Sequence, residues 1–124
     1  MTHNQDFAGR RVLLVEDEAM IALLLEDMLS DLGCEVVGPA YSFAPAMEFA
    51  ASDTPIDVAI LDVNLAGQPV FEVADTLKAK GVPIVFSSGY GASGLREADR
   101  DAPVLPKPFK LQDLAEALRR ALDL

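Results

Sequence analysis

The stretch "RRVLLVEDEAM", residues 10–20, places three acids directly after an apolar run. Residues 12–15 have the length and composition of a strand that is buried on both faces. Glu16, Asp17 and Glu18 follow this run without a spacer. Because like charges repel and a carboxylate beside a core loses hydration, acids held at this position need a compensating partner.

The composition is that of one globular domain: 124 residues, 51% hydrophobic and 24% charged. Residues 1–9 are polar and lack the apolar centre of an export signal, so we expect a flexible tail before a domain over residues 10–124. No run is long enough to span a membrane, and the single Cys34 cannot form an internal disulfide. These features favour a cytoplasmic protein.

The formal net charge of −10 argues against direct binding to nucleic acid. Binding to phosphate backbones needs clustered Lys and Arg, whereas this chain has 10 basic residues against 20 acids. Solubility explains most of the acidity. A cation site must therefore be argued from particular acids.

Apolar runs alternate with helical patterns along the whole chain. Strands are expected at residues 12–15, 35–38, 58–61, 84–86 and 104–105. Helices are expected at residues 21–32, 42–50, 70–77 and 111–122, with a weak fifth pattern at 91–99. Alternating strands and helices predict a parallel sheet with helices on both faces. Right-handed crossovers then favour an α/β fold of five βα units in a doubly wound sandwich.

Polar side chains follow four of the five expected strands. In open α/β sheets, ligand sites form at the carboxyl ends of the strands, where the strand order reverses. Should the order be 2-1-3-4-5, the first and third strands are neighbours and Asp17 and Asp62 converge. The residues at this edge are Glu16, Asp17, Asp62, Ser87, Ser88 and Lys107.

Clustered carboxylates of this kind favour Mg²⁺, which takes oxygen ligands. Zinc is disfavoured, because the chain has one cysteine and its only histidine, His3, lies in the tail. A metal held by oxygens, with a lysine and a hydroxyl nearby, is suited to a phosphoryl group. No nucleotide-binding GxxxxGK[ST] loop is present. The phosphoryl group would therefore sit on the protein, where a carboxylate at a strand end can accept it.

Four motifs in this order, "VLLVEDE", "ILDVNLAG", "PIVFSSGYG" and "KPF", resemble a bacterial response-regulator receiver domain. The similarity covers about residues 10–123. It implies a flavodoxin-like, five-stranded parallel sheet, and the order 2-1-3-4-5 is that of the receiver family rather than a result derived from the residues.

The resemblance also implies roles for particular residues. Asp62 would be the phosphoacceptor, Asp17 a direct Mg²⁺ ligand, and Glu16 a ligand largely through water. The backbone carbonyl of Asn64 would complete the protein ligands. Ser88, the fifth residue after Pro83, matches the switch hydroxyl, with Ser87 as its rival. Lys107 would pair with Asp62 or its phosphate, and the Lys107–Pro108 bond is often cis in this family.

One position departs from the common receiver pattern. Many receivers carry an aromatic residue three positions before the lysine, where this chain has Val104. "FSSGYG" followed by "VLPKPF" is closer to the Phe-Ala-Thr-Gly (FAT GUY) subgroup, whose partners are often histidine kinases of the HWE or a related type. Ser87 and Ser88 replace the Ala and Thr of that motif, and Tyr90 is a candidate for the aromatic role.

These features predict a single-domain response regulator of a two-component phosphorelay, and not an enzyme acting on external substrates. It would accept phosphate from a histidine kinase and then contact a downstream protein or a phosphotransfer protein, or act as a phosphate shuttle or sink. One alternative is an unphosphorylated receiver-like interaction module. Another is a Mg²⁺-dependent phosphatase, although Asn64 stands where such enzymes usually carry a second acid.

Overall fold

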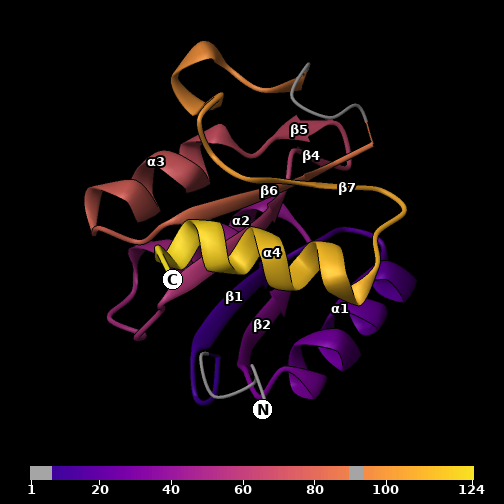
Figure 1. Ribbon diagram of the computed structural model, residues 1–124. Helices are drawn as coiled ribbons and strands as arrows, with labels where there is room; N and C mark the ends of the chain where they lie inside the picture. Colours follow the sequence, from indigo (N-terminus) through magenta and orange to yellow (C-terminus); the bar gives the residue numbers. More distant parts are fainter. Residues whose placement is uncertain (1–6, 90–93) are drawn as a thin grey trace.

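The computed structural model describes residues 7–89 and 94–124 (Figure 1). Its central feature is a five-stranded parallel sheet with the order β2-β1-β3-β6-β7. The strands are β1 (Arg11–Val15), β2 (Glu35–Ala40), β3 (Val58–Asp62), β6 (Ile84–Ser88) and β7 (Val104–Pro106). The predicted fold class and strand order are confirmed, with β1 paired to both β2 and β3.

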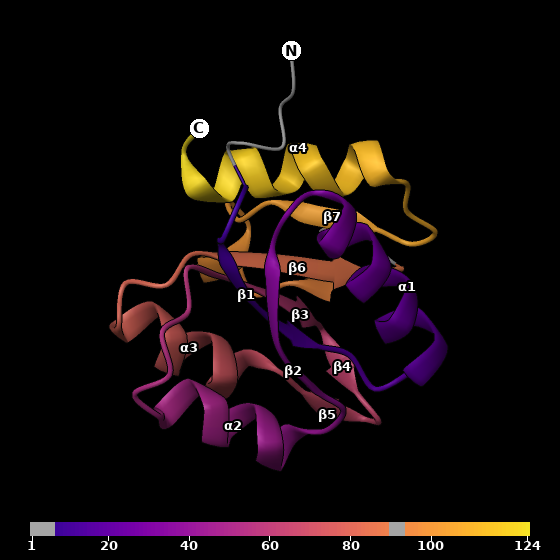
Figure 2. The same cartoon turned by 90° about the horizontal axis from the view of Figure 1, so that it is seen from below.

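Helices cover both faces of the sheet, as Figure 2 shows from below. They are α1 (Ala19–Asp31), α2 (Phe43–Ala51), α3 (Phe71–Ala79) and α4 (Leu111–Leu122). Side chains of β1 alternate between the two faces: Val12 and Leu14 join the core under α1 and α4, whereas Leu13 and Val15 join the core under α2 and α3. Burial on both faces explains why the strands read as unbroken apolar runs.

A small antiparallel hairpin between β3 and α3 was not predicted. Its strands are β4 (Asn64–Leu65) and β5 (Gln68–Pro69), joined by the two residues Ala66 and Gly67. Both turn residues have positive φ, 51° and 90°, as a type I′ turn requires. The buried Leu65 and Val70 anchor the base of the hairpin, and its tip is exposed.

The weak helical pattern at 91–99 does not give an α-helix in the described part of that segment, which begins at residue 94. The segment contains a 3-10 helix, Glu97–Asp99, and the buried side chain of Leu95. Local apolar periodicity is poor here, and ion pairs to α3 hold the segment instead.

The expected flexible tail over residues 1–9 is wrong for residues 7–9. Phe7 is fully buried in the core under α1 and α4, and the Arg119 guanidinium lies 5.4 Å from the centre of its ring. The Gly9 N–H also donates to the Gly33 carbonyl at 2.9 Å. Residues 1–6 lie outside the described residues.

No helix in residues 7–89 and 94–124 combines the length and the apolar character needed to cross a bilayer.

Candidate functional site

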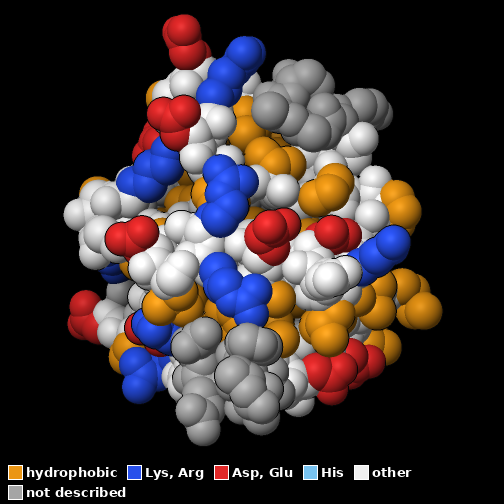
Figure 3. Space-filling view, in the orientation of Figure 1, with side chains coloured by type: hydrophobic (Ala, Val, Ile, Leu, Met, Phe, Trp, Pro, Cys, Tyr) orange, Lys and Arg blue, Asp and Glu red, His pale blue; other side chains and the backbone are white. Residues whose placement is uncertain are grey.

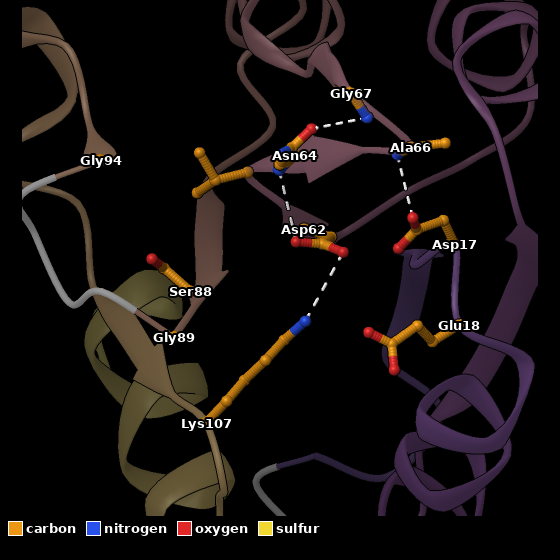
Figure 4. Close-up of a pocket in the computed structure, with 11 residues that line it drawn as sticks. Asp17, Glu18, Asp62, Asn64, Ala66, Gly67, Ser88, Gly89, Gly94 and Lys107 are labelled. Carbon is orange, nitrogen blue, oxygen red and sulfur yellow. Dashed lines mark hydrogen bonds and ion pairs between the residues drawn. The ribbon is translucent and has the colours of Figure 1, made fainter.

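The carboxyl edge of the sheet borders a cavity of about 650 Å³. Figure 4 shows the side chains that converge on it from the ends of the strands and from the hairpin. The lining residues are Asp17, Glu18, Asp62, Val63, Asn64, Ala66, Gly67, Ser88, Gly89, Gly94 and Lys107. The sheet edge predicted from the sequence is therefore the place where a cavity and polar groups coincide.

Three carboxylates gather at this edge because β1 and β3 are adjacent. Val15 pairs with Leu61 in register, so the residues that follow them come side by side. Glu16, Asp17 and Asp62 each offer an oxygen within 4.8 Å of the others. Glu16 and Asp62 are 1% and 6% exposed, so their charges have little access to water.

Lys107 reaches the acids from the far side of the cavity. Its Nζ lies 3.2 Å from Glu16 Oε1 and 3.5 Å from Asp62 Oδ2. Burial lowers the pKa of Lys107, but the charges of Asp62 and Glu16 more than offset burial and raise it overall. The ammonium is therefore held in its charged form. The Lys107–Pro108 peptide bond is cis, as the resemblance implied.

The pKa values of Asp62 and Asp17 are shifted in opposite directions. Burial, followed by the charge of Glu16 and hydrogen bonds that the protonated carboxyl donates to Asp17 and Glu16, raises the pKa of Asp62 to about 7, against the opposing charge of Lys107. Burial also raises the pKa of Asp17, but hydrogen bonds from Asp62, the Ala66 amide and neighbouring groups bring it below its usual range. In the absence of a cation, Asp62 therefore exchanges its proton near neutral pH, where Asp17 is ionised.

The donor set fits a hard cation. Three carboxylates face one ammonium, and the described group contains oxygen donors but no Cys or His. Glu16 Oε1 is buried, and among the described residues it has an ion-pair partner, Lys107 Nζ at 3.2 Å, but no hydrogen-bond donor. Oxygen ligands with surplus negative charge are the chemistry that Mg²⁺ prefers.

Ser88 lines the cavity, whereas Ser87 is not among the lining residues. In Figure 4 the Ser88 hydroxyl points away from Asp62, towards the segment that carries Gly94. A methyl group added at Gly94 would lie 3.8 Å from Ser88 Oγ, so this segment forms the cavity wall beside Ser88. Ser87 pairs with Asp62 in register, and its buried hydroxyl has no hydrogen-bond partner among residues 7–89 and 94–124.

The aromatic switch expected in many receivers has no counterpart at Val104. This side chain is partly buried and packs against the core under α2 and α3. Tyr90, the other candidate, lies outside the described residues.

Several cavity residues were missed by the sequence reading. Glu18, which was not predicted as a site residue, is exposed and lies at the cavity wall. Ala66 and Gly67 enter through the hairpin turn, whose signal is the "AG" pair between short strands. Asn64 lines the cavity as expected, and its N–H faces Asp62 Oδ1 at 3.4 Å. Its backbone carbonyl as a metal ligand stays a prediction.

A family model described as the response regulator receiver domain matches residues 12–119. The chain belongs to this family. Receiver domains of two-component response regulators are signalling phosphoacceptors, which agrees with acids, a lysine and a hydroxyl gathered at one edge of the sheet.

Curated and solved relatives agree with the family assignment. The receiver is 37% identical over 117 residues to the transcriptional regulatory protein PdtaR of Mycobacterium tuberculosis, covering 91% of this chain and 57% of PdtaR. The solution structure of SdrG from Sphingomonas melonis Fr1 matches with a TM-score of 0.80 and 41% identity, over 94% of this chain and 98% of SdrG. The solution structure of the BeF3-activated conformation of SdrG from Pseudomonas melonis Fr1 matches with a TM-score of 0.78 and 41% identity. This match covers 93% of the present chain and 98% of SdrG.

The receiver spans about half the length of the curated relatives it matches: 57% of PdtaR and, for the regulator PhyR of Methylorubrum extorquens, 43%. The Phe-Ala-Thr-Gly subgroup stays a prediction.

Proposed function

We propose that this receiver accepts a phosphoryl group on Asp62 from the phosphohistidine of a sensor kinase. The observation that carries the proposal is the position of Asp62: a carboxylate 6% exposed, at the wall of an open cavity, with Lys107 Nζ 3.5 Å from its Oδ2. A structural aspartate at this depth would be expected to have a full set of hydrogen-bond donors. The contacts of Asp62 to the Asn64 N–H and to Lys107 Nζ are long, at 3.4 and 3.5 Å, and its acidic neighbours and burial raise its pKa.

In the proposed transfer, one bond to phosphorus forms as another breaks. A carboxylate oxygen of Asp62 forms a bond to phosphorus, the bond from phosphorus to the histidine nitrogen breaks, and its electron pair returns to the imidazole. Later, water attacks phosphorus, which releases inorganic phosphate and regenerates the carboxylate. Lys107 pairs with the phosphoryl oxygens throughout.

Asp17, Glu16, Asp62 and the Asn64 carbonyl would hold Mg²⁺. When bound, Mg²⁺ neutralises the charge that otherwise keeps a phosphoryl donor away from three acids. Cation binding also requires the ionised form of Asp62. We infer that Ser88 turns inward after transfer and donates its hydroxyl to a phosphoryl oxygen, which couples the site to the segment around Gly94.

The proposed output is contact with another protein. The phosphorylated receiver would bind a downstream partner or pass its phosphate to a phosphotransfer protein in the cytoplasm, and the kinase would be of the HWE or a related type. Figure 3 shows acidic and basic side chains interspersed on one face of the molecule, so the described residues form no continuous basic patch there. A face of this kind does not favour binding to nucleic acid.

Incubation with acetyl phosphate, followed by intact-mass measurement, tests the proposal. Wild type should gain one phosphoryl group in the presence of MgCl₂ and none in EDTA, and Asp62→Asn should gain none. Asp53→Asn, an exposed loop variant, is the matched control and should be labelled like wild type. Labelling of Asp62→Asn would overturn the assignment, and an unlabelled but folded wild type would favour the interaction-module alternative.

A further inference from the structure

The β4–β5 hairpin contacts the acidic cluster through its backbone. The Ala66 N–H at the hairpin tip donates to Asp17 Oδ2 at 2.9 Å, a bond between residues 49 positions apart. Figure 4 shows this bond at the rim of the cavity, opposite Lys107. It joins an exposed turn to the carboxylate that the receiver resemblance makes a direct metal ligand.

The turn is built so that this N–H faces the cavity. Ala66 and Gly67 both have positive φ, and a second bond from the Gly67 N–H to Asn64 Oδ1 at 2.8 Å closes the turn. At the base, the Val70 N–H donates to the Val63 carbonyl at 3.2 Å, and Leu65 is 2% exposed. The contacts at the base of the hairpin therefore fix the position of its tip, although the residues of the tip are exposed.

A backbone donor on Asp17 has two effects that suit a metal ligand. A charge-assisted hydrogen bond favours the ionised carboxylate, in line with the lowered pKa of Asp17. It also fixes one carboxylate oxygen and so the orientation of the other. Groups that orient metal ligands in this way commonly decide affinity for the metal.

We propose that the hairpin turn is a positioning element for the cation site, acting through the Ala66 N–H on Asp17. The proposal rests on the Mg²⁺ site of the proposed function and adds a requirement to it. Gly67 is needed because a side chain at φ 90° strains the turn, and Ala66 contributes its backbone rather than its methyl group. Neither residue touches the phosphoryl group in this mechanism.

The test compares two glycines in the same backbone state. Gly67 (φ 90°) and Gly81 (φ 81°) both have open space where a Cβ would lie, but Gly81 is at the far end of α3. Valine at either position should lower the melting temperature by a similar few degrees. Titration with MgCl₂, followed by amide NMR shifts, should give a Kd roughly tenfold higher for Gly67→Val and within about twofold of wild type for Gly81→Val.

Two further variants isolate the hydrogen bond. Ala66→Gly relieves the positive φ and keeps the N–H, so its Kd for Mg²⁺ should equal that of wild type. Replacing residue 66 by lactic acid, which exchanges this N–H for an oxygen, should raise the Kd as Gly67→Val does, and it serves also if the valine variant does not fold. A wild-type Kd in both Gly67→Val and the lactate variant would overturn the hairpin inference and leave the proposed function standing. A wild-type protein that binds no Mg²⁺ would instead contradict the proposed function.

Discussion

At the scale of single residues, Asp62 is placed where its carboxylate can react, but its burial there makes the stability of the fold depend on pH. Burial, together with the neighbouring Glu16 and Asp17, raises the pKa of its carboxyl group to about 7. In the unfolded chain the pKa would be near 3.9. The folded protein thus binds this proton more tightly than the unfolded chain does. The associated stability is fully present below about pH 4 and is lost as the pH rises through about 7.

Asp62→Asn should remove this pH dependence. Without Mg²⁺ at pH 8, the variant is expected to have a free energy of unfolding about 1–3 kcal/mol higher than wild type, because it no longer buries an ionised carboxylate beside two other acids. At pH 5 the difference should be smaller, because the folded protein keeps Asp62 protonated there and only the unfolded chain has released its proton. Urea unfolding at both pH values measures the difference, and an equal effect at pH 5 and pH 8 would contradict the assigned titration.

Ser87 is a second residue whose substitution is expected to change the stability of the protein. Its buried hydroxyl has no partner in the part of the chain that the structure describes, so Ser87→Ala should raise the free energy of unfolding by about 1 kcal/mol. Ser52→Ala is a contrasting control, because the Ser52 hydroxyl donates to the Phe49 carbonyl at 2.8 Å and its loss should destabilise. Chemical unfolding of the two variants should therefore give opposite signs. Destabilisation by Ser87→Ala would mean that the hydroxyl has an unrecognised partner.

At the scale of elements, an ion-pair cluster holds the segment around the 3-10 helix against α3. Arg96 forms a bidentate pair with Asp75, at 3.0 and 2.7 Å, and its Nε donates to Asp99 at 2.7 Å. Lys78 pairs with the other oxygen of Asp99, which is 1% exposed. Arg96 also lies 4.6 Å from the centre of the Phe71 ring. These contacts replace the apolar face that a regular helix would bury.

Arg96→Ala should therefore lower the free energy of unfolding by about 2 kcal/mol, because it leaves the buried Asp99 with Lys78 alone. The neighbouring exposed Arg100→Ala should change it by no more than roughly 0.5 kcal/mol. Thermal or urea unfolding measures both. Equal effects of the two substitutions would show that the cluster is a solvated surface contact.

Helix α1 presents an apolar face beside the site. Met20, Leu23 and Leu24 are 78%, 53% and 45% exposed, and Figure 3 shows hydrophobic side chains gathered on the side where α1 lies. A second cavity of about 310 Å³ is lined by Ile21, Leu24, Lys107, Pro108 and Phe109. Because this apolar face lies beside the proposed acceptor site, we expect α1 to contact the kinase of the proposed function.

Met20→Ser should slow phosphotransfer from a phosphorylated kinase roughly tenfold, since exposed apolar anchors dominate contact energies. Labelling by acetyl phosphate should be unchanged, because the acceptor site is intact. Leu124→Ser, which changes another exposed apolar side chain away from α1, is the control. Loss of labelling from both donors in Met20→Ser would place the defect in the site rather than in docking.

At the scale of the whole molecule, the fold was predictable and the long-range contacts were not. Buried parallel strands read as apolar runs, so the sheet, four helices and the polar edge followed from the sequence. The burial of Phe7, the hairpin bond to Asp17 and the Arg96 cluster join residues far apart in the chain, and local periodicity carries no signal for them. Residues 94–99 lack a clear apolar stripe, which is why the helix expected there was wrong.

The most direct measurement is the identity of the residue that carries the phosphoryl group. After incubation with acetyl phosphate and MgCl₂, borohydride reduces an aspartyl phosphate to homoserine, which peptide mass spectrometry can locate. We expect homoserine at position 62, absent in EDTA and absent without donor. Homoserine at another aspartate, or a phosphorylated protein with no homoserine, would contradict the assignment of Asp62 as the acceptor.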